Sequence, residues 1–118
     1  MSNFRNDHSF KIRREEASRI IKKYPDRVPI ICERSRHCTE LPELDRKKYL
    51  TPGSLTFAQF MLVIRKRIDM LESDQALYCF VGDSSMVPVG KTLNEVYNEF
   101  KHEDGFLYVT FASESTFG

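Results

Sequence analysis

The run Phe106-Leu107-Tyr108-Val109-Thr110-Phe111 constrains the fold of this chain more than any other stretch. Large apolar side chains occupy both its odd and its even positions, whereas a strand with one face in water alternates apolar with polar residues. A strand that is apolar on both faces lies inside a sheet and is covered on both sides. Since Asp104-Gly105 supplies a turn before it, we predict a central strand over residues 106–113.

The rest of the chain supplies elements for one domain around that strand. Its 118 residues suffice for a single core, and no apolar run approaches the ~20 residues that span a bilayer. Pro25 ends a helix, and Thr56 and Thr92 each begin a capping box. The patterns predict, in order, a helical turn at 4–8, a helix at 11–24, strands at 28–34 and 48–52, a helix at 57–68, a strand at 75–81, a helix opening at 93 and the strand at 106–113.

This order of elements predicts an α+β fold. A hairpin, a crossing helix and a last strand that is apolar on both faces make a ubiquitin-like β-grasp, with a four-stranded mixed sheet and two helices. We expect residues 1–26 to form an N-terminal helical extension, residues 27–113 the ubiquitin-like core, and residues 114–118 a flexible C-terminal tail.

Charge is divided unequally along the chain. Residues 1–67 carry 16 Lys and Arg against 8 Asp and Glu, whereas residues 68–118 carry 2 against 9. Such polarity predicts a basic surface for acidic partners, and the absence of a reader motif argues against nucleic acid. On the helix at 11–24 we expect an apolar face of Ile12, Ala17, Ile20, Ile21 and Tyr24. We expect solvated basic faces that steer encounters, with Arg13, Arg14, Arg19, Lys22 and Lys23.

The three cysteines do not indicate a catalytic or metal site. They are odd in number and widely spaced, which argues against a disulfide framework and for a reducing compartment. His37 beside Cys38 has no second ligand pair at zinc-like spacing, so we expect no metal and no cofactor. We expect no enzyme activity. The alternative, a hydrolase, would pair Cys38 or Cys79 with His8, His37 or His102, without a local signature to support it.

The stretch Lys48-Tyr49-Leu50-Thr51-Pro52 predicts a short edge strand. It alternates in polarity and stops at a proline, which has no N–H to donate. An exposed strand edge flanked by apolar pockets captures an extended peptide by strand addition. The alternative is an ordinary edge that the charges of residues 46–48 merely protect against aggregation.

The chain ends in Glu114-Ser115-Thr116-Phe117-Gly118. Glycine has no Cβ, so its carboxylate can thread a narrow channel and be activated. A flexible tail can then reach an enzyme's cysteine as a thioester and be passed to an amine. A terminal glycine after a β-grasp pattern therefore indicates a protein that is conjugated to another molecule.

Together these segments resemble the ubiquitin-like modifiers of autophagy, a family that includes the GABA-receptor-associated protein and its relatives. The resemblance covers essentially the whole chain and is jointly specific. It rests on six segments: residues 24–33 (YPDRVPIICE), 47–50 (KKYL), 59–60 (QF), 63–68 (VIRKRI), 103–108 (EDGFLY) and 116–118 (TFG).

The resemblance implies that an activating and a conjugating enzyme join Gly118 to the amine of phosphatidylethanolamine. This lipid is the one group that we expect the protein to carry. It implies that a cysteine protease trims the precursor and releases the lipid. Gly118 is the last residue here, which fits a chain made ready for conjugation as well as a trimmed one. The protein would be a cytoplasmic monomer before conjugation and lie on autophagosome, vesicle and vacuole membranes afterwards.

The resemblance also implies recruitment of cargo receptors through aromatic-x-x-aliphatic peptides. The aromatic pocket would comprise Glu16, Ile20, Pro29, Ile31, Lys48, Leu50 and Phe106. The aliphatic pocket would comprise Tyr49, Pro52, Leu55, Phe60, Val63 and Ile64. Arg27, Lys47 and Arg67 would contact acidic residues around the motif. Thr51 stands where the family usually has Val, which predicts a more polar aliphatic pocket.

An alternative from another class is a scaffold that is never conjugated. It would link membrane cargo or cytoskeleton through the basic N-terminal helices, and Gly118 would be dispensable.

Overall fold

The structure, a computed structural model, describes residues 3–68, 75–82 and 85–113. Two N-terminal helices come first, α1 (Phe4–Asp7) and α2 (Phe10–Lys23). The core that follows consists of β1 (Arg27–Arg34), β2 (Lys48–Pro52), α3 (Phe57–Arg67), β3 (Tyr78–Val81), α4 (Leu93–Phe100) and β4 (Leu107–Ala112). No helix among the described residues is both long enough and apolar enough to cross a membrane.

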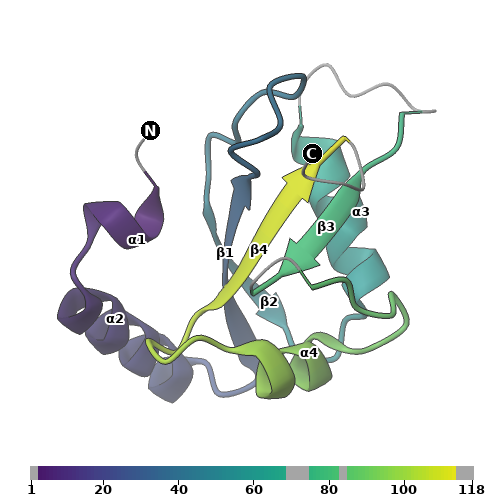
Figure 1. The fold of residues 1–118 in the computed structure, drawn as a ribbon. Helices are drawn as coiled ribbons and strands as arrows, with labels where there is room; N and C mark the ends of the chain where they lie inside the picture. The colour runs from purple at the N-terminus through teal and green to yellow at the C-terminus, as the bar shows by residue number, and fades with distance from the viewer. Residues whose placement is uncertain (1–2, 69–74, 83–84, 114–118) are drawn as a thin grey trace.

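The strands form one mixed sheet in the order β2-β1-β4-β3 (Figure 1). β1 pairs antiparallel with β2 and parallel with β4, and β4 pairs antiparallel with β3. The ubiquitin-like β-grasp with an N-terminal helical extension is thereby confirmed.

β4 lies inside the sheet, and both of its faces are covered. Leu107, Val109 and Phe111 face the main core together with side chains of α3 and α4. On the opposite face lies a smaller cluster, here called the N-terminal cluster, which α1 and α2 cover (Figure 1). Its buried members are Phe4, Ala17, Ile31, Phe106 and Tyr108. The prediction of a central strand is therefore confirmed.

The helix starts follow the predicted capping chemistry. The Thr56 and Thr92 hydroxyls each accept a hydrogen bond from the backbone N–H three residues on, and the Gln59 and Glu95 side chains accept one from the backbone N–H of the cap. A capping box satisfies two backbone donors that a helix end would otherwise leave unpaired. Both starts are also joined to each other by an antiparallel bridge between Thr56 and Thr92.

β3 is shorter than predicted. The sequence pattern predicts a strand from residue 75, but only Tyr78–Val81 pair with β4. Before β3, the Gln75 carbonyl accepts a hydrogen bond of 2.7 Å from the Arg65 guanidinium of α3. The Arg65 side chain therefore supplies the donor for this carbonyl that, in a strand beginning at residue 75, a neighbouring strand would supply.

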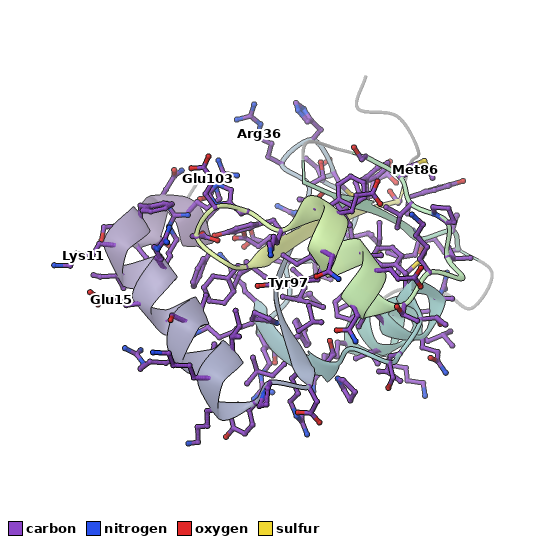
Figure 2. All side chains as sticks on the ribbon, turned by 90° about the horizontal axis from the view of Figure 1, so that it is seen from below. Lys11, Glu15, Arg36, Met86, Tyr97 and Glu103 are labelled. Carbon is purple, nitrogen blue, oxygen red and sulfur yellow. The ribbon has the colours of Figure 1, made fainter. Side chains whose placement is uncertain are left out.

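The predicted apolar face of α2 is wrong in part. Ile12 is 54% exposed and Ile21 and Tyr24 are also exposed, whereas Arg13 is only 8% exposed. The helix contacts the rest of the protein through a narrow stripe whose buried residues are Arg13 and Ala17. The turn before β4 approaches this stripe closely. A Cβ added to Gly105, whose φ is +95°, would lie 2.9 Å from the Ala17 Cβ. Lys11 and Glu15 point away from the sheet (Figure 2).

Arg13 belongs to a buried polar network and not to the solvated basic face predicted for it. Its guanidinium lies 2.5 Å from the Asp104 carboxylate and donates to the His8 carbonyl. Tyr108 donates to the same carboxylate oxygen at 2.5 Å, and the Phe106 N–H donates to the other oxygen. Burial, helped by the bond to Asp104, raises the pKa of the Tyr108 phenol. The network fastens α2 to the turn before β4.

Candidate functional site

β2 lies at the edge of the sheet, and its outer edge is defined by its register with β1. Pro29 lies opposite Leu50 and has no N–H, so these two residues form a non-hydrogen-bonded pair. Three positions along, at a hydrogen-bonded pair, the Cys32 N–H donates to the Lys47 carbonyl at 2.8 Å. The alternation of an antiparallel ladder therefore turns the N–H and C=O groups of Lys48 and Leu50 away from β1.

The outward Leu50 carbonyl has one described partner. The Arg27 guanidinium donates a hydrogen bond of 3.1 Å to it from the exposed surface. The same guanidinium lies 5.9 Å from the Tyr24 ring centroid. Arg27 is thus placed over the edge of β2, beside the position where a further strand would pair.

A hollow of about 570 Å³ lies beside the same edge. It is lined by Phe4, Arg46, Lys47, Lys48 and Leu50. The sequence predicts only a helical turn around Phe4 and does not indicate its place beside β2. The signal for it is slight, because one large apolar residue in a polar N-terminal lead-in does not reveal which strand it meets.

The structure gathers the predicted aromatic-pocket residues in one place next to this hollow. Ile31 and Phe106 are fully buried in the N-terminal cluster with Phe4, and half-buried Ile20 packs against that cluster. Pro29 is buried and Leu50 is half-buried. The Lys48 ammonium forms an ion pair with the Glu16 carboxylate.

The predicted aliphatic-pocket residues divide into a buried base and an exposed surface. Tyr49, Phe60 and Ile64 belong to the main core, with the Tyr49 ring packed edge-on against Phe60 at 6.0 Å. Burial raises the pKa of the Tyr49 phenol to about 12. At the surface, Leu55 and Val63 are half-buried, and Pro52 is exposed.

Thr51 lies on the same face of β2 as Tyr49, toward the core. It is 9% exposed, and its hydroxyl has no hydrogen-bond partner among the residues that the structure describes. The more polar pocket predicted from Thr51 is therefore, in this structure, a buried hydroxyl beneath the strand.

Replacing Thr51 by valine is expected to raise the free energy of unfolding by roughly 1 kcal/mol. The change removes a buried polar group without a described partner and keeps the β-branched shape that suits a strand. Urea denaturation of both proteins measures the effect. Thr110→Val on β4, where Thr is half-buried, is the matched control. A less stable Thr51→Val variant would show that this hydroxyl is satisfied in solution.

The basic residues predicted to meet acidic peptides already have partners within the chain. Lys47 lies 3.0 Å from the Glu33 carboxylate, and Lys48 pairs with Glu16. The Arg67 guanidinium lies over the Tyr49 ring at 5.8 Å. An acidic ligand would therefore exchange one set of interactions for another at these positions, with a smaller net gain than free cations would give.

The described residues do not assemble a metal site, and burial suppresses ionisation of two of the three thiols. They contain no group of three or more His, Cys, Asp or Glu side chains that could hold a metal ion. Burial raises the pKa of the Cys79 thiol to about 12 and that of Cys32 well above its ordinary value. Burial also opposes ionisation of Cys38, but hydrogen bonds, mainly from Ser113, outweigh it and lower the pKa of that thiol.

Comparison with known proteins adds sequence and structural relatives. A family model described as "Autophagy protein Atg8 ubiquitin like" matches residues 12–118. Autophagy-related protein 8 of Mycosarcoma maydis is 49% identical over 117 residues, covering 99% of this chain and 97% of that one. Autophagy-related protein 8e of Arabidopsis thaliana is 48% identical over 115 residues, covering 98% and 92%. The crystal structure of Trypanosoma brucei ATG8 superposes with a TM-score of 0.88 at 37% identity, covering 100% and 99%.

Proposed function

Because this chain belongs to the Atg8 family of ubiquitin-like autophagy proteins, we propose that it is a conjugated membrane tag that recruits receptor peptides along the edge of β2. The observation that carries the proposal is the pair of outward-facing backbone groups on Leu50, next to a hollow that Phe4, Leu50 and basic side chains line. The tag itself performs no chemistry; enzymes act upon it.

A receptor peptide would bind as a fifth strand beside β2. Its backbone would pair with the outward N–H and C=O groups of Lys48 and Leu50. It would take the place of Arg27 at the Leu50 carbonyl, and the displaced guanidinium would then be available for an acidic side chain. The register of β1 and β2 supports this mode, because it leaves these backbone groups outside the existing ladder.

The two apolar pockets would select the peptide's side chains. In an extended peptide, residues three apart are separated by about 10 Å, at about 3.3 Å per residue. An aromatic side chain would enter beside the N-terminal cluster, and an aliphatic one would lie on Leu55 and Val63. The two apolar contacts and the strand pairing favour binding, and the loss of conformational freedom in the peptide opposes it. Together these contributions give roughly micromolar affinity, a binding free energy of about −8 kcal/mol.

Acidic residues around the peptide's motif would add electrostatic contacts with Arg27, Lys47 and Arg67. All three lie around the β2 edge and its pockets. Because these cations have partners in the free protein, the contacts would contribute mainly to selectivity and encounter, and they would weaken with salt.

Conjugation would take place at Gly118, which lies outside the described residues. β4 ends at Ala112, and the segment that would carry the glycine to an enzyme follows it. An activating and a conjugating enzyme would transfer the Gly118 carboxylate to phosphatidylethanolamine, and a cysteine protease would trim and release it. The protein would therefore be cytoplasmic before conjugation and bound to autophagosome membranes afterwards.

Removing Gly118 is expected to abolish attachment to lipid while leaving the fold intact, because a terminal residue beyond the last strand contributes little packing. Both proteins are incubated with an activating and a conjugating enzyme of a related species, ATP and liposomes containing phosphatidylethanolamine. The mass of the protein is then measured, with a thermal melt of each protein as the control for folding.

The full chain is expected to gain the mass of one phospholipid less water and to float with the liposomes. Two acyl chains anchor a protein stably, at about 0.8 kcal/mol for each CH₂ buried. A lipid adduct on the variant that lacks Gly118 would refute the attachment site. Flotation of both proteins without any adduct would favour the scaffold that is never conjugated.

A further inference from the structure

One carboxylate joins the N-terminal helix to the basic hollow. A single oxygen of Glu33 accepts the backbone N–H of Phe4 at 3.1 Å and lies 3.0 Å from the Lys47 ammonium. Glu33 extends from β1, Lys47 immediately precedes β2, and Phe4 begins α1. The side chains of Glu33 and Lys47 are 18% and 33% exposed, so solvent and ligands reach the pair at its rim.

The same contacts place the Phe4 ring beside the peptide-binding edge. Its centroid lies 5.3 Å from that of Phe106, in an edge-on arrangement, and the Lys48 ammonium lies 5.8 Å above it. Phe4 also lines the hollow together with Lys47, Lys48 and Leu50. Phe4 is therefore both a member of the N-terminal cluster and a wall of the candidate site.

We propose that Glu33 is a specificity-determining residue of this site: an internal carboxylate that competes with the acidic residues of an incoming peptide for Lys47. The inference rests on the proposed function. An acidic side chain entering the hollow would take Glu33's place beside Lys47. Repulsion from the incoming carboxylate would move the Glu33 side chain away from Lys47 and from the Phe4 N–H that shares the same oxygen, so that Phe4 and α1 are released from the hollow.

This competition would reduce the advantage that an acidic peptide has over a neutral one at this site. A neutral peptide cannot displace Glu33 and binds with Phe4 still fixed as a wall. An acidic peptide must first compensate for the loss of the Glu33–Lys47 pair, and it then gains a wider hollow. The chemistry that recognises the partner is thus a carboxylate cluster next to the aromatic anchor, since only carboxylates replace the interaction that Lys47 already has.

The variant that separates the two roles of Glu33 is Glu33→Gln. Its amide oxygen still accepts the Phe4 N–H, but the neutral side chain no longer pairs with Lys47. Glu99→Gln is the matched control, because it removes the same charge from an exposed pair, in which Glu99 of α4 lies 3.1 Å from Lys91, a residue that precedes the helix. Thermal melts of each variant establish that the fold is retained.

Two peptides are titrated into each protein by calorimetry. Both carry an aromatic-x-x-aliphatic motif; three glutamates precede the aromatic in one, and three glutamines in the other. Glu33→Gln is expected to bind the acidic peptide roughly two- to fivefold more tightly than the unmodified protein, the size of one partly exposed ion pair. Its affinity for the neutral peptide changes by less, and Glu99→Gln changes neither.

A second readout reports on Phe4 directly. Saturation of the unmodified protein with the acidic peptide is expected to speed hydrogen exchange at the Phe4 amide, whereas the neutral peptide leaves it slow. If both peptides bind but Glu33→Gln leaves their affinity ratio unchanged, the role of Glu33 is refuted and the proposed function stands. If neither peptide binds the unmodified protein, the receptor-binding function fails together with this inference.

Discussion

Replacing Asp104 by alanine is expected to lower the free energy of unfolding by about 3–5 kcal/mol. Asp104 is 1% exposed and joins the Arg13 guanidinium, the Tyr108 hydroxyl and the Phe106 N–H. Its removal leaves a buried cation without its counter-ion and two donors without their acceptor. Breaking a buried pair from one side costs far more than the intact pair contributes, since the remaining charge stays desolvated.

Urea denaturation of the variant and the unmodified protein measures this loss. Glu99→Ala, which breaks the exposed pair with Lys91, is the control and is expected to cost less than about 1 kcal/mol. Hydrogen exchange in α2 should also become faster in Asp104→Ala, because the network fastens this helix to the turn before β4. Equal stability of the two variants would show that the Arg13 network contributes no more than a surface ion pair.

The elements that sequence predicts well are those whose burial leaves a local pattern. Phe106–Phe111 is apolar at every position but one, and only an interior strand covered on both faces buries such a run. The two helix starts are equally local, because Thr56 and Thr92 find their capping partners three residues away. The edge position of β2 follows from Pro52 and the neighbouring charges, which a central strand would not accommodate.

The features that sequence reasoning misses depend on partners distant in the chain. A helical pattern places Arg13 among solvated cations, and nothing near it indicates that Asp104 neutralises it from 91 residues away. Likewise, Phe4 meets Phe106 and Lys48 only after the sheet has formed. β3 begins later than predicted, at Tyr78, and before it Arg65 binds the Gln75 carbonyl, an interaction between a helix and a loop that strand propensity does not encode.

The candidate site also contains features that the sequence predicts and features that it does not. The resemblance to known modifiers supplies the pocket residues; the structure places those of the aromatic pocket at the N-terminal cluster and those of the aliphatic pocket on and beside the main core. The internal competitors, Glu33 for Lys47 and Arg27 for the Leu50 carbonyl, follow only from the register and the contacts. A list of cations around a groove therefore overestimates the positive charge that the free protein offers to a ligand.

Replacing Leu50 is expected to have the largest effect on peptide binding. Loss of its apolar contact in Leu50→Ala should weaken binding roughly tenfold, since a buried aliphatic side chain contributes about 1.5–3 kcal/mol. Tyr49 is unsuitable for the same test, because it is 6% exposed and packs on Phe60, so alanine there would destabilise the core. Met86→Ala is the control, as this exposed side chain lies on the far side of the molecule from α2 (Figure 2).

Leu50→Pro separates the backbone contribution from that of the side chain. The Leu50 N–H points away from β1, so proline removes no bond of the existing ladder, and edge strands tolerate proline in this orientation. An incoming strand, however, loses its donor at this position. An unpaired carbonyl on the bound peptide costs about 1–3 kcal/mol, which is roughly a five- to hundredfold further loss of affinity beyond that of Leu50→Ala.

The comparison of Leu50→Ala with Leu50→Pro is the most direct test of strand addition at β2. Calorimetric titration of one aromatic-x-x-aliphatic peptide into both variants, with thermal melts to establish that each is folded, measures the difference. We predict that the proline variant binds at least about fivefold more weakly than the alanine variant. Equal affinity of two folded variants would contradict the account, because the peptide would then not pair with the outward backbone of β2.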